Sequence, residues 1–198
     1  MMKAILLAAG FSSRMGRLKQ ILPISGKAMI YHAAAPFLAA GLKLIVVLGH
    51  KRESVRAALG DLPCEYVVNP HPEHGMFSSV QRGCCEVGEH EGCLLTTCDC
   101  PGIRVDTITA VRERLSKGDS RVIIPSFNRR RGHPAGLPVS LVKEILQLPR
   151  DFPGLNSLWR EHHDMIEHLE VDDPAVLRDL DRPEDIQRLL SSNASITM

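Results

Sequence analysis

The sequence predicts a three-layer α/β fold with a mostly parallel central sheet. Short apolar runs alternate with helix-like segments from the start of the chain to residue 125. This alternation is typical of repeated βαβ units, which place parallel strands side by side. The run LKLIVVL is apolar at nearly every position, as in a strand buried on both faces. We therefore expect helices on each side of the sheet.

The expected elements follow from hydrophobic periodicity and from the glycine, proline and polar residues that bound each run. Strands are expected at 4–8, 42–48, 64–68, 93–97, 121–125 and 166–171. Helices are expected at 27–40, 52–59, 76–87, 105–115, 141–148, 155–162 and 183–190. Residues 129–138 fit neither pattern, so a basic, turn-rich connection is expected there. Without an internal repeat or a long linker, the 198 residues are expected to form a single domain, 1–198.

Composition is that of an ordinary globular protein. Hydrophobic residues make up 44% and charged residues 24%, and the net charge of +1 gives no general attraction to nucleic acid or to a membrane. No apolar run approaches the roughly 20 residues of a membrane span, and the apolar start is too short for a signal peptide. We expect a cytoplasmic protein with neither nucleic-acid nor membrane partners.

The six cysteines form no C-x-x-C pair. A structural zinc site is therefore not expected, because such sites draw on closely spaced cysteine pairs. Several of these cysteines fall in or beside expected strands and helices. We expect free, mostly buried thiols in a reducing compartment.

The segment 3–23, KAILLAAGFSSRMGRLKQILP, carries the strongest functional signal. A loop of small residues leaves the first expected strand and brings Ser12, Ser13, Arg14 and Lys19 after it. Such a loop lets backbone N–H groups approach a polyanion, and the arginine fork and the lysine charge would neutralise it. Neither established glycine-rich phosphate pattern is present. Taken alone, these residues also fit an ordinary polar connection.

LAAGFSSRMGRLKQILP resembles the signature L-A-A-G-x-S-x-R-M-G-x-x-K-x-L-L-P of the molybdenum-cofactor nucleotidyltransferases, and more broadly the sugar and isoprenoid-precursor nucleotidyltransferases. One position differs, with Ile21 in place of the first leucine of L-L-P. The resemblance implies a Rossmann-like three-layer nucleotidyltransferase (GT-A-like) fold. It also implies that this loop binds an NTP. The nucleotide-binding residues it implies here are Ala8, Ala9, Gly10, Ser12, Ser13, Arg14 and Lys19.

Asp99, in the sequence CDCP, leaves the expected strand 93–97. A carboxylate at the end of a central parallel strand lies at the ligand-binding edge of the sheet, and Mg²⁺ takes carboxylate together with phosphate oxygens. Capping of the following helix is the alternative role. The resembling family carries D-x-P at this strand end as its metal site, which implies that Asp99 binds Mg²⁺.

A second acidic segment, LRDLDRPED, lies near the C-terminus. Asp179 and Asp181 are two residues apart on an extended segment and so point the same way. Helix capping again is the simpler role. The segment resembles the family's D-I-D-T-P-E-D, with Arg182 in place of threonine, and this implies that Asp181 makes the second metal contact. Whether Asp179 shares that role is left open.

The sequence RGHP resembles the R-x-G-H-P of the molybdenum-cofactor branch, where it lines the acceptor side. This implies acceptor-binding roles for Arg131, Gly132 and His133. A solvated basic turn is the alternative for the preceding arginines. Asn156 stands near the place where several relatives carry an acceptor-side arginine, and this departure argues against molybdopterin as the specific acceptor.

GMFSSVQRG, which begins at residue 75, is similar to the family's G-M-x-x-S at the edge of the base pocket. The similarity implies a nucleotide contact for Ser79, with helix capping as the alternative. His71 and His74 precede it in a loop broken by prolines. Without a third ligand nearby, their spacing does not predict a metal site.

Together these resemblances imply a Mg²⁺-dependent nucleotidyltransferase that joins an NMP to a phosphorylated acceptor such as molybdopterin and releases pyrophosphate. CTP is the favoured nucleotide because Ala9 stands where guanine-using relatives often have glycine. The implied catalytic residues are Arg14, Lys19 and Asp99. Residues 1–126 would bind the nucleotide, 127–190 would bind the acceptor and complete the sheet, and 191–198 would form a tail.

The resemblance also suggests a molybdoenzyme or its maturation factor as a partner. Two alternatives stay open. A glycosyltransferase of related fold would normally show D-x-D at a strand end, where this chain has Asp-Cys-Pro. A non-catalytic nucleotide-binding accessory protein for molybdoenzyme maturation would tolerate loss of Lys19 or Asp99, and both are present.

Overall fold

The computed structural model describes residues 2–149 and 151–191, so the expected tail beyond 191 lies outside the described residues. The strands are β1 Lys3–Ala8, β2 Pro23–Ile24, β3 Lys27–Ala28, β4 Lys43–Leu48, β5 Glu65–Val68, β6 Cys93–Thr97, β7 Val122–Phe127, β8 Arg130–Arg131, β9 Ala135–Leu137 and β10 Ile166–Glu170. The α-helices are α1 Met29–Ala39, α2 Arg52–Ala57, α3 Met76–Val87, α4 Val105–Leu115, α5 Val139–Gln147, α6 Leu155–Glu161 and α7 Pro183–Ser191. Short 3₁₀ turns are η1 Ser13–Met15, η2 Lys19–Ile21, η3 Pro72–His74, η4 His163–Met165 and η5 Pro174–Leu177.

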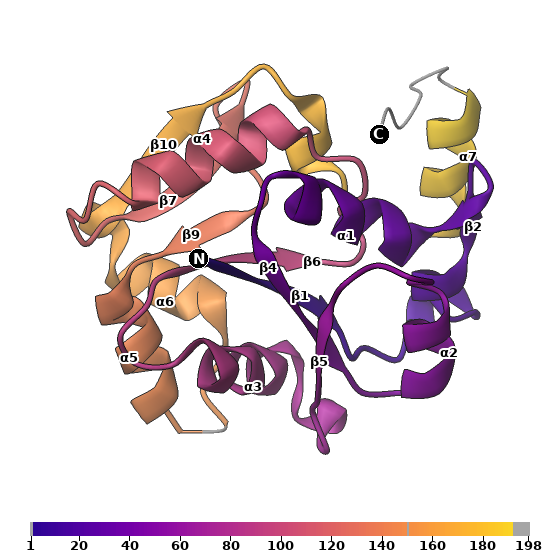
Figure 1. Ribbon diagram of the computed structural model, residues 1–198, viewed down its shortest axis with the longest axis horizontal. Helices are drawn as coiled ribbons and strands as arrows, with labels where there is room; N and C mark the ends of the chain where they lie inside the picture. The colour runs from indigo at the N-terminus through magenta and orange to yellow at the C-terminus, as the bar shows by residue number, and fades with distance from the viewer. Residues whose placement is uncertain (1, 150, 192–198) are drawn as a thin grey trace.

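The central sheet has the strand order β10-β7-β9-β6-β1-β4-β5, and β8 adds to β7 (Figure 1). β1 pairs in parallel with both β4 and β6, β4 with β5, and β7 with β10. Only β8 and β9 run antiparallel within the described part of this sheet. The predicted α/β fold with a mostly parallel sheet is therefore confirmed.

Helices cover both faces of the sheet, as the apolar strands require. Along β1, Ala4, Leu6 and Ala8 pack into one core with residues of α1, α2 and α4. Ile5 and Leu7 point the other way, into a core shared with α3, α5 and α6. The alternation of side chains along a strand thus separates the two layers of helices seen in Figure 1.

The prediction that residues 129–138 form an irregular connection is wrong in one respect. The segment contains two strands, β8 and β9. β9 lies between β6 and β7, in the middle of the sheet, and all three of its residues are buried. Gly136 packs closely there, since a Cβ on it would come within 3.2 Å of Val111 Cγ1 and 3.3 Å of Ile123 Cβ. A strand this short, made of Ala, Gly and Leu, carries no β-branched pattern from which sequence could predict it.

The helix expected at 27–40 begins two residues later, at Met29, because a small hairpin precedes it. β2 and β3 pair antiparallel, and the two residues between them, Ser25 and Gly26, have φ angles of 47° and 83°. Positive φ at both central positions is the geometry of a two-residue hairpin turn. The remaining expected helices and strands fall within a few residues of their predicted bounds.

The parallel strands bring their carboxyl ends to one edge of the sheet. The chain leaving β1 there passes close to the chain leaving β4, since a Cβ on Gly49 would lie 2.8 Å from the carbonyl oxygen of Ala9. The N–H of His50 donates to that same carbonyl at 3.2 Å. Glycine at position 49 is thus what lets the loop after β1 pack down on the sheet edge. Across 2–149 and 151–191, no helix is both long and apolar enough to span a membrane.

Candidate active site

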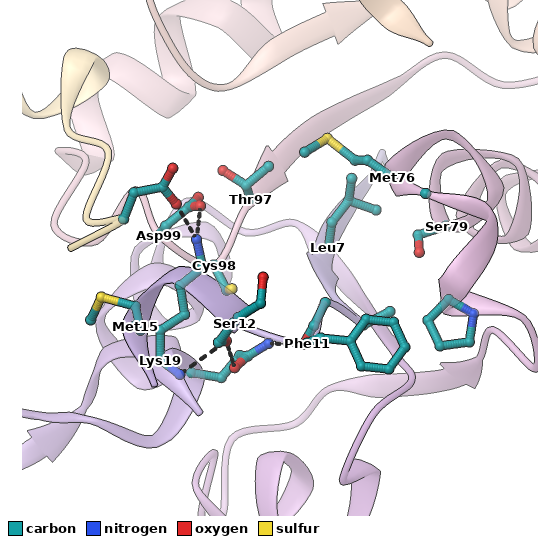
Figure 2. A pocket seen from close by; sticks show the side chains of 17 residues that line it. Leu7, Phe11, Ser12, Met15, Lys19, Met76, Ser79, Thr97, Cys98 and Asp99 are labelled. Carbon is teal, nitrogen blue, oxygen red and sulfur yellow. Dashed lines mark hydrogen bonds and ion pairs between the residues drawn. The ribbon is translucent and has the colours of Figure 1, made fainter. Parts of the chain in front are cut away.

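A cavity of about 420 Å³ opens at the carboxyl ends of β1 and β6. Its walls come from the loop after β1, from the segment that leads into α3, from residues 97–99 at the end of β6, and from Asp181. Figure 2 shows these side chains converging on one space. The volume lies in the range of small-molecule sites, about 300–1,000 Å³.

A buried glutamine side chain holds the loop after β1 in shape. Nε2 of Gln20 donates to the carbonyl oxygens of Gly10 at 2.9 Å and Ala8 at 3.3 Å. Its Oε1 accepts from the hydroxyl of Ser12 at 2.9 Å, and that hydroxyl oxygen accepts from the N–H of Lys19 at 3.1 Å. Sequence reasoning missed Gln20; the available signal was a polar residue set among apolar ones next to Lys19.

Most of the residues predicted to bind a nucleotide line this cavity. They are Ala9, Gly10, Ser12, Ser13, Lys19 and Ser79. Ala8 does not line it: its side chain is buried in the core, and its carbonyl serves the Gln20 side chain. The backbone of Arg14 lies in η1, and the side chain of Arg14 lies outside the described part of the structure.

Lys19 joins the two carboxylates that were predicted to bind metal. Its Nζ lies 2.5 Å from Oδ2 of Asp99 and 2.7 Å from Oδ1 of Asp181. These side chains are only 14%, 15% and 19% exposed. The 3₁₀ turn η2, the end of β6 and the segment before α7 therefore meet at one cluster of charges, although Asp181 is 162 residues from Lys19.

The pKa values of Lys19 and Asp99 reflect mutual stabilisation. Burial lowers the pKa of Lys19, but the charge of Asp99 and hydrogen bonds to both carboxylates outweigh it and raise that pKa above its usual value. Burial likewise raises the pKa of Asp99, and the charge of Lys19 with hydrogen bonds from Lys19 and Thr97 holds it below its usual value. The lysine is therefore cationic and Asp99 anionic at neutral pH.

The C-terminal acidic segment is fixed onto the end of β6 by its backbone. The N–H of Leu180 donates to the carbonyl oxygen of Asp99 at 3.1 Å. Asp185 then caps the start of α7, accepting from the N–H groups of Asp181 at 3.2 Å and Arg182 at 2.8 Å. These bonds bring Asp179 into the same cluster, where one oxygen each from Asp99, Asp179 and Asp181 lies within 4.8 Å of the others.

This cluster fits a hard divalent cation. All of its donors are carboxylate oxygens, the ligands that Mg²⁺ and Mn²⁺ prefer. The ammonium of Lys19 already occupies a position between two of them, where it stands in for a cation. A metal ion could be held by Asp99 and Asp181, with Asp179 as a third source of oxygen.

The opposite end of the cavity is largely apolar. Phe11 and Met76 line it although they are 48% and 62% exposed, and Figure 2 shows them on the side of Ser79, away from Lys19. The centroid of the Phe11 ring lies 5.0 Å from the centroid of the His50 ring. Solvent-exposed aromatic and thioether groups at a cavity wall are suited to stacking against a planar ligand. Sequence reasoning did not single out either residue.

The start of α3 is positioned by Asn69, a buried residue at the end of β5. Its Nδ2 donates to the hydroxyl oxygens of Ser78 at 2.8 Å and Ser79 at 3.0 Å. Ser78 in turn donates to the carbonyl oxygen of Gly75 at 2.8 Å. Among the described residues, the hydroxyl of Ser79 accepts one hydrogen bond, from Asn69, and Ser79 lines the cavity, so its proton is available to a ligand there.

The structure does not bring the predicted acceptor-binding residues into this cavity. Arg131 is exposed on β8, which extends the end of β7 at the same edge of the sheet. Gly132 packs directly against the backbone of Val176. A Cβ on Gly132 would come within 2.4 Å of the carbonyl oxygen of Val176, so a larger residue does not fit. Its role in the fold is therefore close packing, and sequence reasoning missed this packing contact.

His133 lies near the cluster without lining the cavity. Its N–H donates to the carbonyl oxygen of Val176 at 2.9 Å, and its ring nitrogen Nδ1 is buried with no hydrogen-bond partner in the described part of the chain. Burial lowers the pKa of His133, opposed by the charge of Asp99 and a hydrogen bond with the backbone of Leu95. The imidazole is therefore neutral near pH 7, close enough to Asp99 to feel its charge.

Three known proteins resemble this chain over nearly its whole length. Nicotine blue oxidoreductase of Paenarthrobacter nicotinovorans is 28% identical over 195 residues, which cover 94% of this chain and 95% of that protein. Molybdenum cofactor cytidylyltransferase of Escherichia coli (strain K12) is 25% identical over 182 residues, 91% of each protein. A solved nucleotidyl transferase from Methanothermobacter thermautotroptrophicus has a TM-score of 0.81 at 25% identity, covering 98% of this chain and 99% of that one.

The N-terminal signature pointed to the same group of proteins, and the family match confirms it. Residues 4–166 match the MobA-like NTP transferase domain, and this span takes in β1 through the start of β10. It includes Lys19 and Asp99 but ends before Asp181. The chain belongs to the family of the MobA-like NTP transferase domain and is a nucleotidyltransferase.

Proposed function

We propose that this protein transfers CMP from CTP to a phosphorylated small-molecule acceptor, in a Mg²⁺-dependent reaction that releases pyrophosphate. The observation that carries the proposal is the cavity with two different ends. Lys19, Asp99 and Asp181 gather charge at one end, while Phe11 and Met76 present apolar surface at the other. A nucleoside triphosphate has the same division, with a polyanion joined to a planar base.

Asp99 and Asp181 would hold the Mg²⁺ ion. Their carboxylate oxygens are suitable ligands for it, and they already enclose one positive charge, the ammonium of Lys19. When bound, the ion would neutralise charge on the phosphates and on the departing pyrophosphate. Lys19 would then turn from the carboxylates to the phosphate oxygens, which offer the same kind of anionic partner. The exchange lets the same lysine neutralise the acidic cluster before binding and the triphosphate afterwards.

The reaction is a substitution at the α-phosphorus of the NTP. An oxygen of the acceptor phosphate forms the new P–O bond, the bond to the bridging oxygen of the β-phosphate breaks, and pyrophosphate leaves. Such chemistry depends on alignment and on charge neutralisation. Lys19 would stabilise negative charge on the phosphates, Arg14 would assist from η1, and the loop held by Gln20 would keep the backbone N–H groups of residues 9–13 in position.

The apolar end of the cavity would take the base. Phe11 would stack on its face, and Ser79, with a proton to donate, would contact its polar edge or the ribose. CTP is the favoured nucleotide for two reasons: Ala9 lines the cavity where guanine-using relatives often have glycine, and the relative from E. coli is a cytidylyltransferase.

The acceptor would bind on the β8 side of Asp99, where Arg131 can meet a phosphate monoester. Gly132 would keep the chain packed closely against Val176 there, and His133 would place its neutral ring beside the acceptor. Molybdopterin is not favoured as the specific acceptor because Asn156 replaces the expected arginine. A molybdoenzyme or its maturation factor is proposed as the protein partner.

The test is to incubate the protein with each NTP in turn, with Mg²⁺ and a panel of phosphorylated acceptors that includes molybdopterin, and to measure pyrophosphate. We expect release with CTP that depends on both the acceptor and Mg²⁺. Equal release with all NTPs would contradict the choice of CTP. If pyrophosphate release is the same with and without every acceptor, the activity is hydrolysis of the NTP and not transfer.

The identity to nicotine blue oxidoreductase supports one second candidate, an oxidoreductase activity. The same protein preparation can be tested for oxidation of NADH or NADPH in the presence of coloured aromatic electron acceptors. Turnover there, insensitive to Asp99→Asn and without pyrophosphate release under any condition, would favour this candidate over nucleotidyl transfer.

A further inference from the structure

The loop between β5 and α3 carries a second set of metal-binding side chains, separate from the carboxylates around Lys19. His71 and His74 each offer an imidazole nitrogen and Glu73 a carboxylate oxygen, and the three donor atoms lie within 4.8 Å of one another. The two rings are stacked, with centroids 5.1 Å apart and planes at 14°. We propose that these three side chains bind one transition-metal ion, Zn²⁺ by preference, at the rim of the nucleotide cavity.

Hydrogen bonds to the backbone hold the turn that carries these side chains in shape without any metal. Oδ1 of Asn69 accepts from the N–H of His71 at 3.0 Å, and the N–H of His74 donates to the carbonyl oxygen of His71 at 3.1 Å. The single hydroxyl proton of Ser78, which is shared with the nearer carbonyl of Gly75 at 2.8 Å, also lies within reach of that carbonyl, at 3.3 Å. All three ligands thus come from one short turn, η3 and the residue before it, anchored to a buried asparagine. A pre-ordered backbone lowers the entropic cost of binding an ion.

The donor set differs in kind from the one at Asp99. Two imidazole nitrogens and one carboxylate suit Zn²⁺, Co²⁺ or Ni²⁺, whereas a cluster made only of carboxylates suits Mg²⁺. In a tetrahedral zinc site the donor atoms lie about 3.4 Å apart. The His71 and Glu73 side chains are 52% and 55% exposed, so they can rotate. Such rotation can bring the three donor atoms from their present separations, within 4.8 Å, to the spacing of a zinc site. Three protein ligands would leave a fourth position open, as in sites where zinc meets water or a ligand.

The position of the turn connects this site to the nucleotide cavity. Pro72 lies between two of the ligands, and Gly75 and Met76 follow the third, and all three line the cavity. An ion at His71, Glu73 and His74 would therefore fix one wall of the cavity. Sequence reasoning found the two histidines without a third ligand; the missing ligand is the glutamate immediately before His74.

The test is titration of chelator-treated protein, without a polyhistidine tag and without nucleotide, with Zn²⁺ in a calorimeter. We expect one ion per chain, with binding at least about tenfold weaker in His71→Ala, His74→Ala and Glu73→Gln, as for loss of one of three ligands. Hydrogen exchange should report the same event, with Zn²⁺ slowing amide exchange at residues 69–76 in the wild type but not in His71→Ala.

Two variants serve as matched controls and should bind Zn²⁺ like the wild type. Cys85→Ser removes the exposed thiol, and His163→Ala removes a surface histidine that also pairs with a carboxylate. Asp99→Asn distinguishes the two clusters, because binding of Zn²⁺ by the carboxylates around Lys19 would be lost in that variant and kept in His71→Ala. The proposal is overturned if the wild type binds no Zn²⁺, if His71→Ala binds it equally well, or if Cys85→Ser or Asp99→Asn is the variant that loses it. These readouts need no turnover, so they stand or fall separately from the nucleotidyl transfer proposed above.

Discussion

Nζ of Lys19 lies 2.5 Å from Oδ2 of Asp99, so the residue expected to bind phosphate is paired with a residue expected to bind metal. The pair is largely shielded from water, and Asp181 completes it from the other side. A phosphate ligand and a metal ion bound as proposed would therefore compete with an internal ion pair for the same groups.

Replacement of Lys19 should affect stability as well as turnover. Lys19→Ala leaves Asp99 and Asp181 close together without their cation, which should lower the free energy of unfolding by about 1–3 kcal/mol in the absence of divalent ions. Mg²⁺ should then raise the melting temperature of the variant more than that of the wild type, because it replaces the lost charge. Lys117→Ala, at an exposed lysine, is the control and should show neither effect.

The same change should lower kcat/KM by about 100-fold or more, as for loss of one preorganised group that stabilises charge in the transition state. Kinetics with saturating Mg²⁺ separate this loss from the loss of stability. Unchanged kcat/KM in Lys19→Ala would remove this residue from the reaction.

Replacement of Asp99 should reveal the metal. Asp99→Asn keeps the size of the side chain but removes its charge, and an amide is a weaker ligand for Mg²⁺. NTP binding, measured by calorimetry, should weaken in the presence of Mg²⁺ and change little in EDTA. Asp61→Asn, at an exposed carboxylate, provides the control. An equal loss with and without Mg²⁺ would show that Asp99 does not act through a metal ion.

Phe11 should determine the affinity for the base. Stacking of a base on an aromatic ring contributes about 1–3 kcal/mol, so Phe11→Ala should raise the KM for CTP about 5- to 150-fold. The maximal rate should change little, because the ring touches the base in the ground state and the transition state alike. Phe11→Trp retains a stacking surface and should keep a low KM. If Phe11→Ala and Phe11→Trp behave alike, stacking is not the source of the affinity.

Arg131 should affect the acceptor and not the nucleotide. Arg131→Ala removes a charge on the β8 side of the site and should raise the KM of the phosphorylated acceptor while leaving CTP affinity unchanged. Arg130→Ala is the matched control, since neighbouring residues of a strand point to opposite faces. If Arg131→Ala and His133→Ala both weaken CTP binding and leave the acceptor's KM alone, the two halves of the site are reversed.

Much of this site could be predicted from sequence because its parts lie at strand ends. β1 and β6 are apolar runs with clear bounds, and parallel pairing brings Lys19 and Asp99 to one edge although they are 80 residues apart. What sequence could not supply was the partner of each group. The ion pairs of Lys19 with Asp99 and Asp181 are visible only when the three segments are folded together.

Other features of the fold and the site could not be predicted from the sequence, because no local sequence pattern indicates them. Gln20 looks like any polar residue of a turn, and only its buried bonds to the β1 loop reveal that it holds the loop. β9 enters the sheet through close packing of small residues, which periodicity does not report. Glu73 adds a third ligand to two histidines through the shape of η3. The prolines at 70 and 72 indicated only an irregular loop there, so this turn was not predicted.

The most direct test of the account follows the phosphorus atoms of CTP. The protein is incubated with Mg²⁺ and a protein-free extract of cellular small molecules, once with CTP labelled at the α-phosphorus and once with CTP labelled at the γ-phosphorus. The account predicts α-label in a new small-molecule product, γ-label in pyrophosphate, and neither with Asp99→Asn. The appearance of γ-label in the product, or the same products from Asp99→Asn and the wild type, would contradict it.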